Sequence, residues 1–191
     1  MGASLQSPKV SPRRPSTPAV IAVAVLGLIL AWAHFQQGHE TPFRAGETAP
    51  ELGFTDLAGN EVNLTSARGR VVVMNFWATW CAPCLTELPS LDRLHRALSP
   101  EGLVVLAVSV DERSVDVAAF VRARGLSLPV LRDPGGAEAA RKLAVQGYPT
   151  TFVVDAAGRL QARYLGVAEW DLPEALDHFR GLLKESTSPT R

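Results

Sequence analysis

Two cysteines are the side chains of this sequence best suited to chemistry, and they lie three positions apart. Cys81 and Cys84 form a Cys-x-x-Cys pair in the segment WCAPC, and the chain has no other cysteine. A disulfide scaffold uses more cysteines at wider spacings, so both sulfurs are free for chemistry. Because two intervening residues let the sulfurs meet in a disulfide, the spacing predicts a redox pair.

The elements around this pair favour its reactivity. A β-branched and aromatic run at residues 71–77 predicts a central strand covered on both faces. Leucines from Leu85 to Leu98 recur at helical spacing. The N–H groups and partial positive charge of a helix N-terminus stabilise a thiolate, so the pKa of the thiol falls from ~8.5 into the range ~3.5–7.5. We expect Cys81 to be the exposed nucleophile and Cys84, one turn inside, to be the resolving thiol.

Metal binding is the main alternative use of two cysteines. Structural zinc needs two more ligands. The four histidines, His34, His39, His95 and His178, offer no suitable spacing within the domain. We therefore expect no metal and no organic cofactor. A non-enzymatic Cu(I) carrier stays open as an alternative, since two soft thiolates suit Cu(I).

The rest of the soluble region alternates strands and helices. The expected elements are a leading hairpin (54–55 with 62–64), a strand at 103–110, a helix at 114–124, an extended piece at 128–130, a helix at 137–143, and hairpin strands at 151–154 and 159–165. A last helix is expected to start at a capping box of Asp171 with Glu174 and to bury Leu172, Leu176, Phe179 and Leu183. Pro89 should kink the helix that follows the cysteines. This order predicts an α/β fold with a mixed sheet and helices on both faces.

Two motifs resemble signatures of the thioredoxin superfamily. Residues 76–84, FWATWCAPC, are similar to its redox motif, and residues 147–152, GYPTTF, to its cis-proline segment. The leading hairpin and an extra strand–helix insertion resemble the TlpA/ResA/CcmG branch of membrane-anchored extracytoplasmic thioredoxins, several of which serve cytochrome c maturation. The resemblance covers residues 48–184 and implies a thioredoxin fold, with a mixed central sheet flanked by helices.

The resemblance also assigns candidate roles to neighbours of the pair. It implies a cis peptide bond before Pro149, in a loop facing the disulfide, where the backbone of Tyr148 pairs with an extended substrate. Trp80 is expected to shield the disulfide and line the docking face. Glu87, one turn after Cys84, would shuttle protons or contact substrate. An ordinary solvated glutamate is the alternative.

Four further residues complete the expectations for the site. Asn75 departs from thioredoxins proper, which place a proton-accepting aspartate there, so proton transfer must come from Glu87 or water. Trp77 is expected in the core. Asp111 and Asp133 follow strand-like pieces and are expected to be ordinary loop residues.

The N-terminal region predicts export. Residues 1–18 are rich in Ser and Pro, carry three basic and no acidic side chains, and are expected to be disordered. Residues 19–33 form an apolar run of 15 residues without a charge. Residues 19–35 are expected to form a membrane anchor or a cleaved signal segment, although a spanning helix usually needs ~20 residues. Either leaves the N-terminus cytoplasmic and the domain extracytoplasmic, on the periplasmic side. Residues 36–47 are expected to be a linker and 185–191 a disordered tail.

Charge and motif together narrow the function. After residue 18 the chain has 16 basic and 19 acidic side chains, a net charge of −3, which gives no drive toward nucleic acid. A peroxidase of peroxiredoxin type needs Pro-x-x-x-Thr-x-x-Cys. Before Cys84 the threonine position holds Cys81, and before Cys81 it holds Ala78, so this class is set aside.

We therefore expect a thiol–disulfide oxidoreductase that reduces disulfides in extracytoplasmic proteins, apocytochrome c among the candidates. The resemblance implies re-reduction by a membrane electron donor of the DsbD/CcdA type. A disulfide-forming oxidase is the alternative, because the same residues serve both directions and the reduction potential decides between them.

Overall fold

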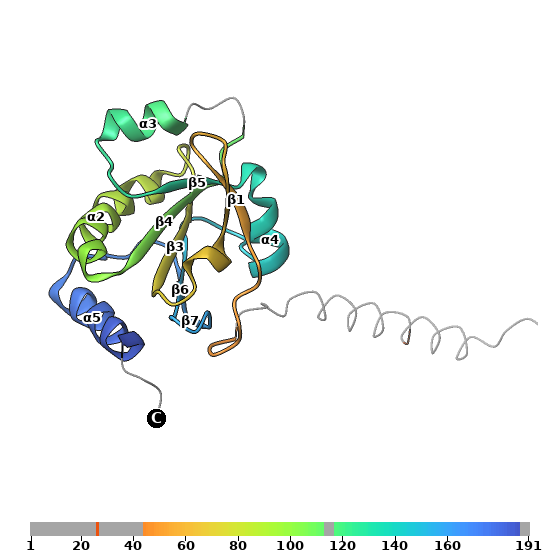
Figure 1. Cartoon of the computed structure of the whole chain (residues 1–191). Coiled ribbons are helices and arrows are strands. Elements are labelled where there is room, and N and C mark those ends of the chain that lie inside the picture. Colours follow the sequence, from red (N-terminus) through yellow and green to blue (C-terminus); the bar gives the residue numbers. More distant parts are fainter. Residues whose placement is uncertain (1–25, 27–43, 113–116, 188–191) are drawn as a thin grey trace, which may run out of the picture. The chain divides into compact units, whose positions relative to one another are not determined.

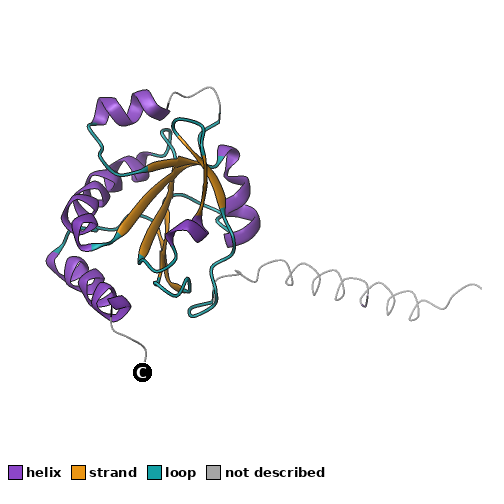
Figure 2. Ribbon diagram, in the orientation of Figure 1, coloured by secondary structure: helices purple, strands orange, loops and turns teal. Residues whose placement is uncertain are grey.

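The computed structural model describes residues 44–112 and 117–187, together with Leu26. Within those ranges seven strands form one sheet in the order β2-β1-β5-β4-β3-β6-β7. Figure 2 shows the strands in orange and the helices in purple. The strands are β1 (Gly53–Asp56), β2 (Glu61–Asn63), β3 (Val72–Trp77), β4 (Val104–Ser109), β5 (Val130–Arg132), β6 (Thr150–Val154) and β7 (Leu160–Leu165). The pairs β3–β4 and β4–β5 are parallel, and the other neighbouring pairs are antiparallel. The sheet is therefore mixed, as predicted.

Helices cover both faces of this sheet. They are α2 (Ala82–Leu98), α3 (Val117–Arg124), α4 (Ala137–Leu143) and α5 (Pro173–Thr187), with 3-10 turns η1 (Leu64–Ala67), η2 (Ser99–Glu101) and η3 (Pro134–Gly136). Figure 1 shows α2 and α5 on one side of the sheet and α4 on the other. The α/β thioredoxin fold, with its leading hairpin β1–β2, is thus confirmed.

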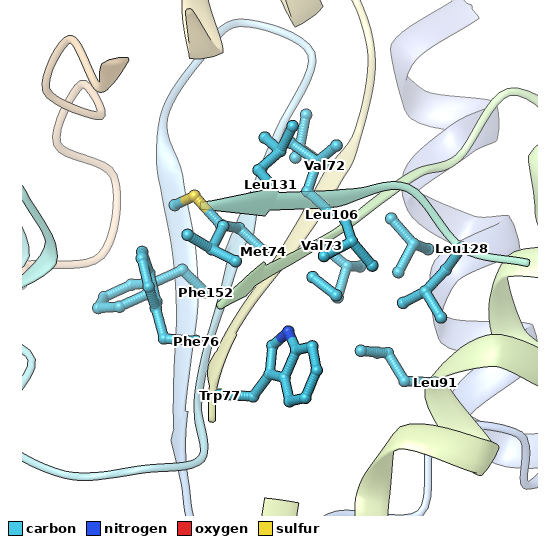
Figure 3. Packing of buried hydrophobic residues seen from close by; sticks show 14 of the residues in the cluster. Val72, Val73, Met74, Phe76, Trp77, Leu91, Leu106, Leu128, Leu131 and Phe152 are labelled. Atoms are coloured by element: carbon cyan, nitrogen blue, oxygen red, sulfur yellow. The ribbon is translucent and has the colours of Figure 1, made fainter. Parts of the chain in front are cut away.

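The central strand β3 anchors the core. All six of its residues are buried, and successive side chains point to opposite faces. Phe76 packs edge-on against Phe152 on β6, with ring centroids 6.1 Å apart. Trp77 contacts Phe120 of α3 at 5.6 Å and is 0% exposed, as expected of a core residue. Figure 3 shows Phe76, Trp77 and Phe152 among the surrounding aliphatic side chains. Because β3 is covered on both faces, it holds the residues that follow it, up to Cys81, in a fixed position.

The last helix differs from the sequence-based expectation. It begins at Pro173, and Asp171 does not belong to its first turn. The Asp171 carboxylate instead accepts hydrogen bonds from Arg93 on α2, at 2.6 and 3.3 Å. Leu172 precedes the helix and is 44% exposed, so it is not part of the buried stripe. The Asp171 carboxylate, which the sequence pattern predicted to cap the last helix, thus forms a tertiary ion pair with Arg93.

Other boundaries shift by a few residues. The extended piece expected at 128–130 becomes β5, two residues later, because pairing with β4 sets its register. Helix α2 continues through Pro89 to Leu98. Helix α5 reaches Thr187, so the predicted tail starts later than residue 185.

The predicted anchor at 19–35 and the segment 1–18 lie outside the described residues, except for Leu26. No helix in the part of the chain that the structure describes is long and apolar enough to cross a membrane. The described part of the predicted linker already pairs with the sheet. Gly46 donates its N–H to the Leu160 carbonyl at 2.7 Å, and Leu160 donates to the Glu47 carbonyl at 2.8 Å.

Candidate active site

The two cysteines are joined in a disulfide where β3 gives way to α2. The Cys81 and Cys84 sulfurs are 2.05 Å apart. Cys81 is the N-cap residue of α2, and its Sγ accepts the backbone N–H of Cys84 at 3.3 Å. Pro83 lies in the first turn, where its missing N–H costs nothing. This sulfur therefore occupies the position where helix amides and the helix dipole stabilise negative charge.

The two cysteines differ less in solvent exposure than the sequence predicted. Cys84 is 0% exposed and Cys81 only 6%. The prediction of an exposed Cys81 is wrong for the disulfide form, because this residue packs into the apolar core cluster. Cys81 is still the more accessible partner, so the thiolate of an incoming reductant would meet its sulfur first.

An aromatic pair lies beside the disulfide. Trp80 is 67% exposed, and its ring meets that of Tyr148 edge-on at 6.0 Å. The peptide bond between Tyr148 and Pro149 is cis. The Tyr148 hydroxyl fits against Gly136, which has a left-handed φ of +69°, and a Cβ there would approach the hydroxyl to 2.4 Å, so glycine lets the tyrosine side chain keep this position. Burial and the nearby Asp133 raise the pKa of Tyr148.

Glu87 is buried one turn after Cys84, with 2% exposure. Its Oε1 accepts hydrogen bonds from the Trp170 indole N–H at 2.6 Å and the Ala168 N–H at 3.1 Å. Its Oε2 accepts from Asn75 Nδ2 at 3.0 Å. Burial raises the pKa of this carboxyl, although the three hydrogen bonds oppose the effect. The alternative of an ordinary solvated glutamate is therefore wrong.

Asn75 and Trp170 complete this network. Asn75 on β3 also donates to Thr151 Oγ1 on β6, at 2.8 Å. The amide therefore holds the Glu87 carboxylate in place of acting as a proton acceptor. Sequence reasoning missed Trp170, which is 83 positions from Glu87 along the chain. Trp170 lies between Glu169 and Asp171 in the sequence, and only its own large apolar side chain could have indicated a buried role.

Two aspartates expected to be loop residues are buried. Asp111 is 0% exposed and Asp133 is 4% exposed. Asp133 accepts the Glu138 and Ala139 N–H groups at 3.0 and 2.9 Å, which caps α4. Asp111 bonds to Thr79 and Ser109. Each follows a parallel strand at the edge of the sheet where Cys81 lies, and that position was the signal available in the sequence.

Comparison with known proteins identifies the family. A model of the AhpC/TSA family matches residues 45–163, more than half of the chain. Thiol-disulfide oxidoreductase ResA of Geobacillus thermodenitrificans is 32% identical over 162 residues, which cover 84% of this chain and 91% of the relative. The chain belongs to the AhpC/TSA family and is a ResA-like member of the thioredoxin superfamily. Thioredoxin-like protein YneN of Bacillus subtilis is 33% identical over 142 residues, or 72% of this chain and 82% of that protein.

Solved structures agree with this ResA-like assignment. A secreted thiol-disulfide isomerase from Corynebacterium glutamicum superposes with a TM-score of 0.62 at 28% identity, over 78% of this chain and 96% of that one. A thiol:disulfide interchange protein from Bacteroides sp. has a TM-score of 0.61 at 24% identity, over 78% and 94% of the two chains, and supports the fold alone. The chain is an enzyme, a thiol–disulfide oxidoreductase, and such enzymes act on disulfide-bearing substrates.

Proposed function

We propose that this enzyme reduces disulfides in extracytoplasmic proteins, with Cys81 as nucleophile and Cys84 as resolving thiol. The observation that carries the proposal is the place of Cys81 Sγ at the N-cap of α2, where it accepts the Cys84 N–H. That position favours a thiolate on Cys81. Cys84 is fully buried and lies three residues further along, inside the first turn of the helix, which suits an internal second step.

The reaction balances over two sulfur exchanges. The Cys81 thiolate attacks one sulfur of a substrate disulfide, that S–S bond breaks, and a mixed disulfide forms. Cys84 then loses its proton and attacks Cys81 Sγ, so the enzyme disulfide forms and the substrate leaves as two thiols. Two electrons and two protons pass to the substrate. A membrane electron donor of the DsbD/CcdA type would restore the dithiol.

Neighbouring residues suit supporting roles in this scheme. Glu87 lies one turn from Cys84, is buried, and has a raised pKa, which suits a base that takes the Cys84 proton. The margin beside the disulfide consists of three residues: Trp80, which is exposed, Tyr148, which is half-buried, and Pro149, which is buried. We assign substrate docking to this margin, with the Tyr148 backbone pairing to an extended substrate segment.

Location and pathway form a further part of the proposal. The basic N-terminus and the apolar run at 19–35 support an anchored or exported domain with a cytoplasmic N-terminus. Apocytochrome c is the substrate suggested by the resemblance to the TlpA/ResA/CcmG branch. The direction of electron flow is tested by the reduction potential of the Cys81–Cys84 pair. A value of about −250 mV or lower supports a reductant, and one near −120 mV supports an oxidase.

Trapping tests the proposal directly. Cys84→Ser should accumulate a mixed disulfide between Cys81 and its substrate, because the resolving thiol is gone. The adducts are separated on non-reducing gels after acid quenching and identified by mass spectrometry. Cys81→Ser is the matched control and should trap far less. If Cys84→Ser yields no more adduct than Cys81→Ser, the assigned roles of the two cysteines are wrong.

A further inference from the structure

Asp111 is a fully buried carboxylate aimed at the turn that carries the redox pair. It follows β4, yet its side chain crosses to the end of β3. The Thr79 N–H contacts Oδ1 and Oδ2 at 3.2 and 3.0 Å, and Thr79 Oγ1 donates to Oδ1 at 2.7 Å. Ser109 Oγ donates to Oδ2 at 2.8 Å. Among the described residues, Asp111 is the acceptor in each of these hydrogen bonds.

This bonding pattern suits a carboxylate. Ser109 Oγ accepts the Asp111 N–H at 3.2 Å, so its own proton is directed to Asp111 Oδ2. An amide in place of the carboxylate would turn an NH2 group toward at least one of these donors. Asp111 differs here from Asp133, whose oxygens cap the helix that follows it. The Asp111 side chain serves another element.

The element it serves leads directly to the nucleophile. Thr79 is two residues before Cys81, which is a backbone span of at most about 7 Å. Within the same turn, the Cys81 N–H donates to the Ala78 carbonyl at 3.2 Å. Fixing Thr79 therefore fixes the approach of the chain to Cys81.

We propose that Asp111 is a positioning residue that locks the turn before Cys81 and whose buried negative charge disfavours the Cys81 thiolate. This opposes the stabilisation from the helix N-terminus and keeps the pair a stronger reductant. The inference rests on the proposed function for its meaning in catalysis, but thiol acidity and reduction potential are measured without any protein substrate.

Other ionisable side chains lie on the neighbouring elements and are unchanged in the experiment. They are Arg132 and Asp133 on β5 and after it, Glu112 after β4, Tyr148 before the cis-proline and Glu87 on α2. Arg132 Nη2 donates to the main-chain carbonyl of Asp111, at 3.2 Å, and not to its carboxylate. The side-chain charge of Asp111 thus meets hydroxyl and amide donors without a cation among the hydrogen bonds of the described residues.

The test is Asp111→Asn in the full chain. For two unit charges separated by on the order of 10 Å, at an effective dielectric constant of about 20, Coulomb's law gives roughly a tenfold change in an ionisation constant, and this sets the scale expected here. We expect the Cys81 thiol to become about tenfold more acidic, followed as thiolate absorbance at 240 nm against pH. The reduction potential against glutathione, measured at a pH above the pKa of the thiol, should rise by the same factor in the equilibrium constant, which is about 30 mV.

Two variants separate charge from structure. Asp92→Asn removes a second buried, hydrogen-bonded carboxylate on α2, and should leave the acidity of Cys81 unchanged. Thr79→Val loosens the turn but keeps the Asp111 charge, so its thiol must stay less acidic than that of Asp111→Asn. An unchanged Cys81 in folded Asp111→Asn, or an equal change in Thr79→Val, overturns the proposal.

If Asp111→Asn does not fold, Asp111→Ser supplies the uncharged side chain for the same comparison. Failure here is distinct from failure of the proposed function. If Asp111 had no effect on Cys81, the Cys84→Ser variant would still trap mixed disulfides with substrate. If Cys84→Ser trapped no adducts, the measured effect of Asp111 on the acidity of the Cys81 thiol would still stand.

Discussion

At the scale of single residues, two buried carboxylates lie close to one redox pair in the chain's fold. Glu87 lies one turn after Cys84 and bonds to three donors from other segments. Asp111 bonds to the turn before Cys81. Burying a carboxylate is costly unless hydrogen bonds compensate. At both positions several hydrogen-bond donors offset the cost of burial. The charge near each sulfur therefore depends on the tertiary structure.

The ionisation of Glu87 should be visible in stability. Burial raises its pKa above the ordinary 4.5. The folded protein then holds this proton more tightly than the unfolded chain, so the free energy of unfolding falls as pH rises from about 4.5 through the folded-state pKa. Glu87→Gln should flatten that decline, measured by urea denaturation at several pH values from 4 to 8.

Glu174→Gln, on the exposed side of α5, is the control for removing one carboxylate at the surface. It should keep the wild-type dependence of stability on pH. A Glu87→Gln profile as steep as that of wild type would show that Glu87 carries no raised pKa.

At the scale of elements, α2 is tied to the loop before β5 by one side chain. Asp92 accepts the Ser127 N–H at 2.6 Å, Ser127 Oγ at 2.9 Å and the Leu128 N–H at 2.9 Å. Its other oxygen pairs with Arg96 at 2.7 Å. Burial opposes ionisation, but these bonds hold the pKa of Asp92 below its ordinary 3.8. Asp92 therefore fixes α2, the helix that carries the redox pair, to the loop at residues 127–128.

Asp92→Ala should lower the free energy of unfolding by about 2–4 kcal/mol at pH 7, because it leaves buried donors unpaired. The contribution of a group with a lowered pKa is present above the unfolded pKa and lost as pH falls through the folded one. The gap between wild type and variant should therefore narrow below about pH 3.8.

Asp177→Ala is the matched control at the element scale. Asp177 also pairs with an arginine, at 3.4 Å, but its side chain is 76% exposed. Exposed pairs contribute about 0–1 kcal/mol. Equal losses in the two variants would refute the special role of Asp92.

At the scale of the whole described domain, the sheet buries apolar side chains on both faces. Phe76 is 0% exposed and meets Phe54 and Phe152 edge-on, each at 6.1 Å. The chain has a single short-range disulfide. Hydrophobic packing, with no long-range covalent link, therefore holds the domain together.

Phe76→Ala should cost about 3–5 kcal/mol of unfolding free energy, from lost transfer energy and the cavity left behind. This is a large share of the 5–15 kcal/mol typical of a domain. Thermal denaturation followed by circular dichroism measures the loss. Leu165→Ala, at a residue that is 69% exposed, should change stability little. A loss of similar size in both variants would contradict this account of the core.

Much of the fold could be predicted because its signals are local. The continuous apolar run of β3 and the leucine spacing of α2 gave the strand, the helix and the junction where Cys81 lies. The predicted start of the last helix was less accurate. Its expected cap, Asp171, pairs with Arg93, 78 positions away, and no local pattern records such a partner.

The sequence by itself determined that two cysteines lie at a strand–helix junction of a thioredoxin fold, because hydrophobic period and motif spacing are properties of neighbouring residues. Only the tertiary structure decided which carboxylates are buried around them. Glu87 depends on Trp170, 83 positions away, and Asp111 on Thr79, 32 positions away. Burial and hydrogen bonding at such separations exist only once the chain has folded, and they set the charges that the two sulfurs experience.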